Sequence, residues 1–267
     1  MTCAVSGGPD SLALLLLAAT AGCVVTAVHV DHGLREGSAA EGEVVRDAAR
    51  RVGAGFRAER VVVAPGPNLE ARARAARYGV LPADVLTGHT ADDQAETVLI
   101  NLIRGAGLDG VAGMRKGPTK PILAMRRSET RALCDWLGVH VVDDPSNSDR
   151  RFVRNRIRAE VIPLLNDIAG RDVAALVART ADVVGDDVSL LDELAAAIDP
   201  TDAKALTAAD PRLAQRALRA WLRAGGHPPD LATVNRVLAV AQGTTRACEL
   251  AGGFRLERRH QRLRILP

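Results

Sequence analysis

The first half of the chain alternates short apolar runs with amphipathic segments, a pattern typical of strands separated by helices. The predicted strands are 2–5, Val24–Val30, Phe56–Ala64, Asp84–Gly88 and Val139–Val142. The helices predicted between them are Leu12–Ala19, Ser38 to about Val52, Leu69–Tyr78, Thr90–Ile103 and Ser128–Leu137. Strands that alternate with helices predict an α/β fold with a doubly wound, mainly parallel, five-stranded sheet.

The pattern changes at about Phe152, after which helical spacing dominates. Helices are predicted over Val153–Leu165, over Val173–Ala197, from Asp210-Pro211 to Gly225-Gly226, and from Asp230 to about Ala241. Short strands are predicted over Ala247–Leu250, Phe254–Arg258 and Arg262–Leu266. We therefore expect two domains, 1–165 and 166–267, the second mostly α-helical and ending in a small β element.

Composition and cysteine spacing narrow the class of protein. The chain is 47% hydrophobic and 25% charged, which is ordinary for a soluble globular protein. No apolar run is long enough to span a membrane, and the N-terminus lacks the features of a secretory signal. The four cysteines form no CxxC pair, so neither a disulfide framework nor a zinc or iron–sulfur site is suggested. A cytoplasmic protein with no membrane partner is expected.

The basic residues are almost all arginine. The 35 basic residues include three lysines, which leaves 32 arginines. Codon bias explains a general excess, so position is the better guide. Arginines cluster in Arg150–Glu160 and Arg246–Arg264, and such clusters favour contact with a phosphate backbone. Aromatic residues make up only 2% of the chain, so stacking of bases on aromatic side chains is not expected to dominate.

The first candidate site is the turn between the first strand and the first helix, which reads Ser6-Gly7-Gly8-Pro9-Asp10-Ser11. Two glycines allow backbone torsions that close amide groups around an anion, and the helix that follows directs its positive dipole end to the same place. Pro9 suits a first helical turn, and the two serines add hydroxyl donors. No Gly-Lys-Ser/Thr follows, so this phosphate loop is not a Walker loop. It suits a pyrophosphate leaving group.

A second candidate lies where the next parallel strand ends, beside the phosphate loop. Backbone at Val28 and His29 is placed to read an adenine edge, and Asp31 could bind a metal or a ribose. For His29 a purely structural role at the strand end is an equal alternative.

The third candidate again joins a strand end to a helix start and contains His89, Asp92, Asp93 and Glu96. Asp92 and Glu96 are four residues apart on a helix and so share a face. Capping of the helix explains Asp93 well. Capping explains the group of His89, Asp92 and Glu96 less well, and that group could hold Mg²⁺ or a substrate ammonium.

Arginines supply the last candidates. Arg104, at the end of the helix that begins near Thr90, is expected to project near the site and stabilise charge on a phosphoryl group or an adenylate. Arg154 and Arg158 share one face of a predicted helix that also carries Asn155 and Arg156. A solvated basic face is the ordinary alternative, but the position of the helix favours contact with RNA or ATP.

Together, segments 6–11, 29–35, 87–97, 104–107 and 144–158 resemble the tRNA(Ile)-lysidine synthase family of PP-loop ATP pyrophosphatases. The resemblance implies an adenine nucleotide alpha hydrolase-like fold and a ligase that forms a C–N bond. In that reaction ATP adenylates the wobble cytidine of a tRNA(Ile) with a CAU anticodon. L-lysine then displaces AMP to give lysidine. ATP and Mg²⁺ are the implied cofactors, and a homodimer is possible.

The resemblance also implies roles for individual residues. Those implied to bind ATP are Ser6, Gly7, Gly8, Pro9, Asp10, Ser11, Val28 and His29, with Asp10 also placing Mg²⁺. Those implied to be catalytic are Asp31, His89, Asp92 and Arg104. Those implied to bind lysine or tRNA are Asp93, Glu96, Arg154, Asn155, Arg156 and Arg158, with His89 and Asp92 also lining the lysine pocket.

Three alternatives remain open. A PP-loop tRNA 2-thiolation enzyme needs a reactive thiol, and although Cys3 adjoins the loop, no cysteine has a partner in sequence. An amide-forming relative that acts on a free metabolite would not need the basic second domain. A non-catalytic nucleotide- or RNA-binding module would not need the loop, the acidic residues and the arginines together.

Overall fold

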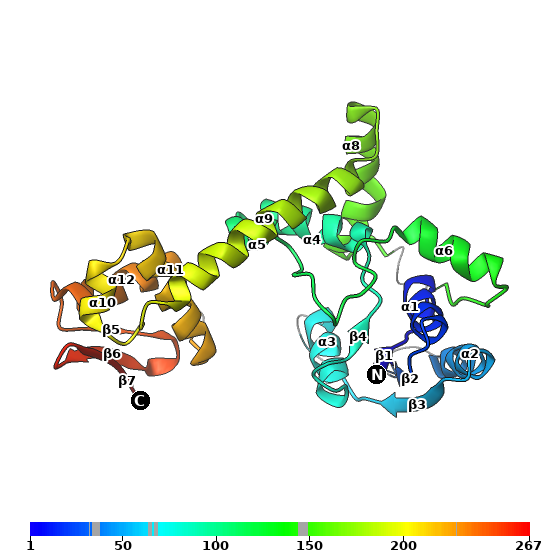
Figure 1. Cartoon of the computed structure of the whole chain (residues 1–267), viewed down its shortest axis with the longest axis horizontal. Helices are drawn as coiled ribbons and strands as arrows, with labels where there is room; N and C mark the ends of the chain where they lie inside the picture. Colours follow the sequence, from blue (N-terminus) through cyan, green and yellow to red (C-terminus); the bar gives the residue numbers. More distant parts are fainter. Residues whose placement is uncertain (32, 34–37, 64–65, 67–68, 144–148, 228) are drawn as a thin grey trace. The chain divides into compact units, whose positions relative to one another are not determined.

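A computed structural model of the chain describes residues 1–31, 33, 38–63, 66, 69–143, 149–227 and 229–267 (Figure 1). The chain forms two compact units, Met1–Gly185 and Asp186–Pro267. The first unit ends inside a long helix, α9 (Val173–Ala196), and the domain boundary expected at residue 165 stays a prediction. In the part of the chain that is described, no helix is both long enough and apolar enough to cross a membrane.

The first unit is built on a parallel sheet with the strand order β3-β2-β1-β4. The strands are β1 (Thr2–Ala4), β2 (Thr26–Asp31), β3 (Gly55–Arg60) and β4 (Leu86–Thr87). The helices between them are α1 (Pro9–Thr20), α2 (Ser38–Arg51) and α3 (Leu69–Val80). Figure 1 shows α1 and α2 on one face of the sheet and α3 on the other. The expected doubly wound α/β fold is confirmed.

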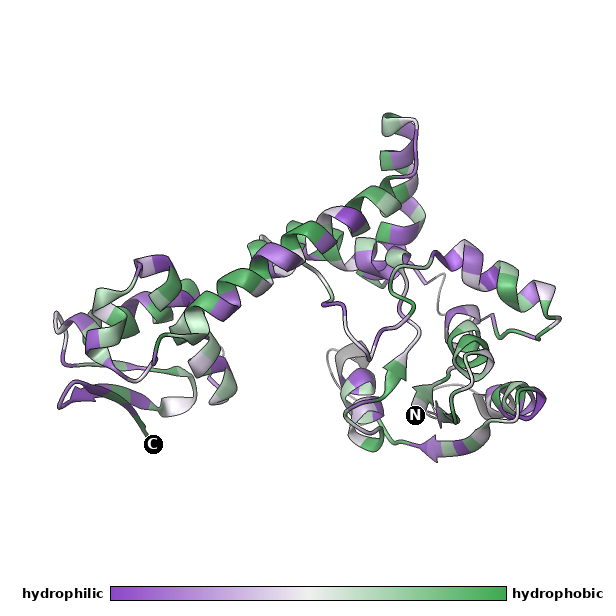
Figure 2. Ribbon diagram, viewed as in Figure 1, coloured by the Kyte–Doolittle hydropathy of each residue, from purple (hydrophilic) through white to green (hydrophobic). Residues whose placement is uncertain are grey.

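Burial on both faces explains the apolar strands. Ala27 in β2 packs into the core beneath α1 and α2, while the next residue, Val28, packs on the opposite face against Leu81 and Val85. Helix α1 lies between the sheet and α6 (Arg127–Trp136), and its residues Ser11–Leu16 are all buried. A helix enclosed in this way needs apolar residues all round, as Figure 2 shows for α1.

Among the described residues the sheet has four strands, and residues 139–142 are not a strand, so the expected fifth strand at Val139–Val142 is wrong. The free edge of β4 is taken by another segment, because Thr87 donates its backbone N–H to the Thr119 carbonyl at 2.9 Å. Val142 instead lies beside the phosphate loop, where its N–H donates to the Gly7 carbonyl at 2.9 Å. The apolar run Val139–Val142, which was predicted to be a strand, therefore ends against the phosphate loop.

The remaining helices of the first unit carry or support the candidate site. They are α4 (Ala91–Ile103), the short α5 (Leu108–Val111), α6, α7 (Val153–Arg156) and α8 (Ile162–Ala169). A π-helical turn, Ile157–Val161, joins α7 to α8, whose second residue is Pro163, which has no N–H to donate to a regular helix. The helix expected over Val153–Leu165 is therefore present, with this turn inside it.

The second unit has its own core and a separate antiparallel sheet, β5-β6-β7. Its helices are α10 (Ala203–Ala208), α11 (Pro211–Ala224) and α12 (Leu231–Gln242), and its strands are β5 (Ala247–Glu249), β6 (Arg255–Arg259) and β7 (Arg262–Leu266). Asp210 and Asp230 accept hydrogen bonds from backbone N–H groups at the starts of α11 and α12, as their sequence positions predicted. Leu218, Leu222 and Leu256 are completely buried in this core.

Candidate active site

The loop between β1 and α1 has the geometry of an anion-binding turn. Gly7 has φ +91°, and a Cβ there would lie 2.8 Å from Val142 Cγ2, so only glycine fits. The Ser11 hydroxyl accepts the Ser6 N–H at 3.1 Å and donates to the Gly8 carbonyl at 2.9 Å. Helix α1 begins with no side-chain cap at Gly8, so its first N–H groups remain for an external acceptor.

The end of β4 approaches this loop very closely. A Cβ on Gly88 would lie 2.7 Å from the Asp10 carbonyl oxygen and 2.9 Å from Ser11 Cα, so a larger residue would push the two segments apart. Helix α4 begins shortly after β4, with Thr90 and Asp93 forming a capping box in which Thr90 N–H donates to Asp93 at 2.9 Å. The packing at Gly88 thus brings the acidic start of α4 next to the phosphate loop.

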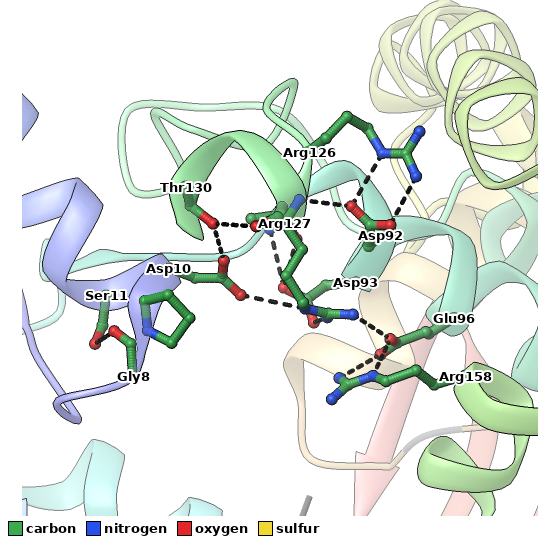
Figure 3. A network of polar contacts seen from close by, with 12 residues as sticks. Gly8, Asp10, Ser11, Asp92, Asp93, Glu96, Arg126, Arg127, Thr130 and Arg158 are labelled. Carbon is green, nitrogen blue, oxygen red and sulfur yellow. Dashed lines mark hydrogen bonds and ion pairs between the residues drawn. The ribbon is translucent and has the colours of Figure 1, made fainter. Parts of the chain in front are cut away.

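Asp10 projects from the first turn of α1 towards α6 (Figure 3). Its carboxylate accepts a hydrogen bond from the Thr130 hydroxyl and lies 3.5 Å from the Arg127 Nε. Burial raises the pKa of Asp10 above its ordinary value, and the contacts with Thr130 and Arg127 only partly offset this effect. The carboxylate is held in place and is still about one fifth exposed.

Arg127 joins the phosphate loop to α4. Besides Asp10, its guanidinium contacts Asp93 at 3.0 Å and Glu96 at 3.1 Å, so one side chain bridges three carboxylates (Figure 3). Although burial acts to lower the pKa of Arg127, these carboxylates raise it. Burial acts to raise the pKa of Asp93, but Arg127 and Arg154 hold it below its ordinary value, so Asp93 is anionic at neutral pH.

Glu96 is completely buried and lies among three guanidinium groups. Arg154 and Arg158 each place a nitrogen 2.7 Å from its carboxylate, and Arg127 contacts it from another side at 3.1 Å. Arg154 comes from α7 and Arg158 from the π-helical turn, so this carboxylate fixes the later helices of the first unit against α4. A buried carboxylate with this many donors avoids the desolvation penalty of an unpaired charge.

Asp92 forms a second arm of the network. It accepts hydrogen bonds from the Arg126 guanidinium at 2.8 and 3.0 Å and from the Arg127 N–H at 2.8 Å. Arg126 also contacts Asp172. Burial acts to raise the pKa of Asp92, but the hydrogen bonds from Arg126 and Arg127 outweigh it, so the pKa is lowered. Five carboxylates therefore meet four guanidinium groups, which gives this group of described residues one net negative charge.

The structure brings together six of the eighteen site residues predicted from sequence. Asp10, Asp92, Asp93, Glu96, Arg154 and Arg158 all belong to one network. Sequence reasoning missed Arg126, Arg127 and Thr130. A signal was present, because Arg126 and Arg127 stand at the N-terminus of α6, where the helix dipole disfavours cations. Two arginines there indicate carboxylate partners elsewhere in the fold.

Arg104 and His89 are not part of this network in the structure. Arg104 is exposed at the C-terminal end of α4, about 18 Å along the helix axis from its acidic start. The expectation that it projects near the loop is not met. His89 pairs its Nδ1 with the Thr87 hydroxyl at 2.8 Å, and burial lowers its pKa to about 4, so its ring is neutral at pH 7.

The residues expected to contact adenosine lie mostly inside the sheet. The Val28 carbonyl accepts the Val5 N–H at 2.9 Å, and its side chain is buried. His29 is buried, with Nδ1 3.1 Å from the Val5 carbonyl, and its Nε2 has no partner among the described residues. The strand continues to Asp31, whose carboxylate accepts the Gly33 N–H at 2.8 Å. The strand predicted over Val24–Val30 therefore runs from Thr26 to Asp31.

The other predicted residues after 149 serve local contacts. Asn155 donates to the Asp149 carbonyl at 2.9 Å, and Arg156 pairs with Glu160 at 3.1 Å. Residues 144–148, and residues 32 and 34–37 of the segment after β2, belong to predicted motifs but lie outside the described residues.

Comparisons with known proteins agree with this geometry. A family model described as a PP-loop domain matches residues 1–165. The chain is 46% identical to tRNA(Ile)-lysidine synthase of Mycolicibacterium paratuberculosis over 240 residues, covering 84% of this chain and 74% of that protein. It is 45% identical to tRNA(Ile)-lysidine synthase of Mycobacterium tuberculosis, covering 83% and 74%.

A solved structure, U34-tRNA thiolase NcsA from Methanococcus maripaludis, matches with a TM-score of 0.55 and covers 69% of this chain and 72% of that chain. Its sequence is 17% identical, so this likeness shows the fold alone. The close sequence relatives decide the family: with its phosphate loop, its acidic helix start and identity of about 45% across most of its length, the chain belongs to the tRNA(Ile)-lysidine synthase family of PP-loop proteins.

Proposed function

We propose that this chain is an ATP-dependent C–N ligase that converts the wobble cytidine of a tRNA(Ile) with a CAU anticodon to lysidine. The cytidine C2 carbonyl oxygen attacks the ATP α-phosphorus, and pyrophosphate leaves. The ε-amine of L-lysine then attacks C2, AMP leaves with the former carbonyl oxygen, and the new C–N nitrogen loses a proton. Family membership supports the reaction class. The substrates and the residue roles are the finer part of the proposal.

One observation carries the proposal. Arg127 contacts Asp10 of the phosphate loop and also Asp93 and Glu96 of α4, so the anion-binding turn and the acidic start of α4 share one side chain. A ligase that activates one substrate with ATP and joins it to an amine needs these two sites adjacent. The network in Figure 3 has that arrangement.

The phosphate loop fits the pyrophosphate end of ATP. Helix α1 starts without a side-chain cap, and the hydroxyls of Ser6 and Ser11 lie 3.2 Å apart beside that start, where the Gly8 N–H donates to Ser6 at 3.4 Å. Asp10 fits a Mg²⁺ ion, which in proteins is commonly held by one or two carboxylates together with substrate phosphates. Bound Mg²⁺ would offset the negative charge that develops on the departing pyrophosphate.

The acidic part of the network fits an amine substrate. Asp93 is anionic at neutral pH, and 14% of its side chain is exposed, so an ammonium group can approach it. Glu96 is completely buried by arginines, so we assign it to holding the pocket rather than to touching lysine. Asp92 and Asp93 are then the carboxylates available to lysine.

Lysine incorporation is the experiment that tests the reaction. The chain is incubated with radiolabelled L-lysine, ATP, Mg²⁺ and CAU-anticodon tRNA(Ile), and label in RNA is measured. We expect label only when all components are present, together with one AMP for each lysine incorporated. The matched control is the same tRNA with uridine at the wobble position. If the tRNA is active but no label from lysine enters it, the proposal is overturned. If label supplied in a sulfur donor enters the tRNA instead, thiolation is favoured.

The cysteines argue against thiolation. Burial raises the pKa of both Cys3 and Cys134 to about 11, so neither thiol is ionised at neutral pH. Burial also raises the pKa of Cys248. A sulfur-transfer mechanism needs a thiolate, so the environments of these three cysteines do not favour one.

A further inference from the structure

The β6–β7 hairpin in the second unit displays arginines on one face. Because residues directly opposite each other in an antiparallel pair point to the same side, the register Leu256↔Ile265 and Arg258↔Leu263 defines one face. That face is internal: Leu256 and Leu263 are buried, and Arg258 donates to the Ala241 carbonyl at 2.8 Å.

The opposite face bears Arg255, Arg259, Arg262 and Arg264, all exposed, with Glu257 between them. Of these arginines, only Arg262 has an ion pair with a described residue, Asp199. Arg212 in α11, by contrast, is 2.8 Å from Asp210. Three of the four arginines on the outer face, Arg255, Arg259 and Arg264, therefore have no ion pair with a described residue, and Glu257 lies directly opposite Arg264 in the register.

The tip of the hairpin is unfavourable on two independent counts. Arg259 and Arg262 are directly opposite each other, and like charges in that position destabilise a sheet. The two turn residues between them, His260 and Gln261, have φ of 50° and 64°. A two-residue turn with positive φ at both positions prefers Asn-Gly, because most other residues resist a positive φ. The positive φ angles and the opposed arginines both lower the stability of the hairpin. Their presence at its tip therefore indicates a function there.

We propose that the outer face of the β6–β7 hairpin binds the phosphate backbone of the RNA substrate. Free guanidinium groups on a rigid two-stranded ribbon suit phosphate oxygens, which guanidinium binds in a two-pronged geometry. The inference rests on the proposed function for the identity of the RNA, and it adds the surface by which the second unit holds that RNA.

The test compares two variants that lose the same charge from the same unit. R259Q/R264Q removes two arginines from the proposed surface and keeps Arg262 with its partner Asp199. R212Q/R223Q removes two exposed arginines from α11. Binding of CAU-anticodon tRNA(Ile) to each full-length protein is measured over a range of salt concentrations, and circular dichroism checks that each variant is folded.

For R259Q/R264Q we expect weaker binding and a slope of log affinity against log salt that is smaller by about 2, because each missing arginine leaves one phosphate unneutralised. We expect R212Q/R223Q to keep the wild-type slope. Equal slopes for the two variants and the wild type would overturn the proposal, as would equal decreases of slope in both variants. A changed sedimentation coefficient with unchanged RNA binding would also overturn it, and would show that the hairpin joins two copies of the chain.

Failure of this proposal is distinguishable from failure of the proposed function. Wild-type protein that forms lysidine while R259Q/R264Q binds tRNA normally would contradict the hairpin surface alone. Wild-type protein that forms no lysidine, but whose salt slope falls in R259Q/R264Q, would contradict the reaction and support the surface.

Discussion

Arg127 is the residue whose replacement should affect both halves of the proposed reaction. R127Q removes the ion pairs with Asp10, Asp93 and Glu96 together, so the loop and the acidic pocket lose their common support. We expect lysidine formation to fall by about 100-fold, because small misplacements of reacting groups have effects of that order. The KM for lysine and the Mg²⁺ concentration for half-maximal rate should both rise, and steady-state kinetics measures all three.

R127K is the matched control for this prediction. Lysine keeps the charge but offers a single ammonium in place of a guanidinium that reaches three carboxylates, so partial recovery is expected. The rate of R127Q could fall only in proportion to the fraction of protein that is unfolded, with the lysine and Mg²⁺ dependence unchanged. That result would show that Arg127 has a structural role alone.

Glu96 should be important for stability. In E96Q three guanidinium groups would face a neutral amide in a buried site, and we expect the free energy of unfolding to fall by about 3 kcal/mol or more. Urea unfolding at pH 7 measures the change. E43Q is the control, because the Glu43–Arg46 pair is exposed and such pairs contribute about 1 kcal/mol or less. Similar small decreases in both variants would contradict the assignment.

His89 should make stability depend on pH between about 4 and 6.5. Burial lowers the pKa of His89 to about 4 in the folded chain, so as the pH falls below 6.5 the unfolded chain gains a proton that the folded chain does not. The free energy of unfolding is then highest above pH 6.5 and decreases towards pH 4, by about 3 kcal/mol at most. Unfolding of wild type and H89Q across this range should differ in slope, and parallel curves would contradict the prediction.

At the scale of elements, the β6–β7 turn provides a direct test of local strain. Replacing His260-Gln261 by Asn-Gly supplies residues that accept positive φ, so we expect the variant to gain about 1 kcal/mol of stability. Thermal unfolding measures the gain. The arginines of the hairpin remain, so tRNA affinity should not fall. A lower midpoint would show that the two side chains stabilise the turn in a way that their torsions do not suggest.

Elements were predicted well where a local signal existed. The Asp caps of α11 and α12, the capping box of α4 and Pro9 at the start of α1 all mark helix starts in the structure. The apolar run Val139–Val142 had no comparable signal to separate a strand from a covering segment. Whether Val139–Val142 joins the sheet depends on Thr119, which pairs with the edge of β4 from another part of the chain. The local pattern of residues carries no information about which segment takes that edge.

At the scale of the molecule, two compact units with separate cores predict two unfolding transitions. The phosphate loop belongs wholly to Met1–Gly185, so Mg·ATP should raise the midpoint of one transition and leave the other nearly unchanged. Differential scanning calorimetry with and without nucleotide measures both. A single transition that shifts as a whole would indicate that α9, which crosses the boundary, couples the units into one cooperative structure.

The sequence alone determined the fold class, the phosphate loop and the acidic helix start, because glycine spacing, caps and apolar runs act over a few residues. It also identified the family, since those motifs occur together. Only the tertiary structure decided how the charges pair. It placed Arg127, Arg154 and Arg158 around Glu96, and it left Arg104 at the far end of α4. Ion pairing depends on distance in space and on burial, and neither is written in the local pattern of residues.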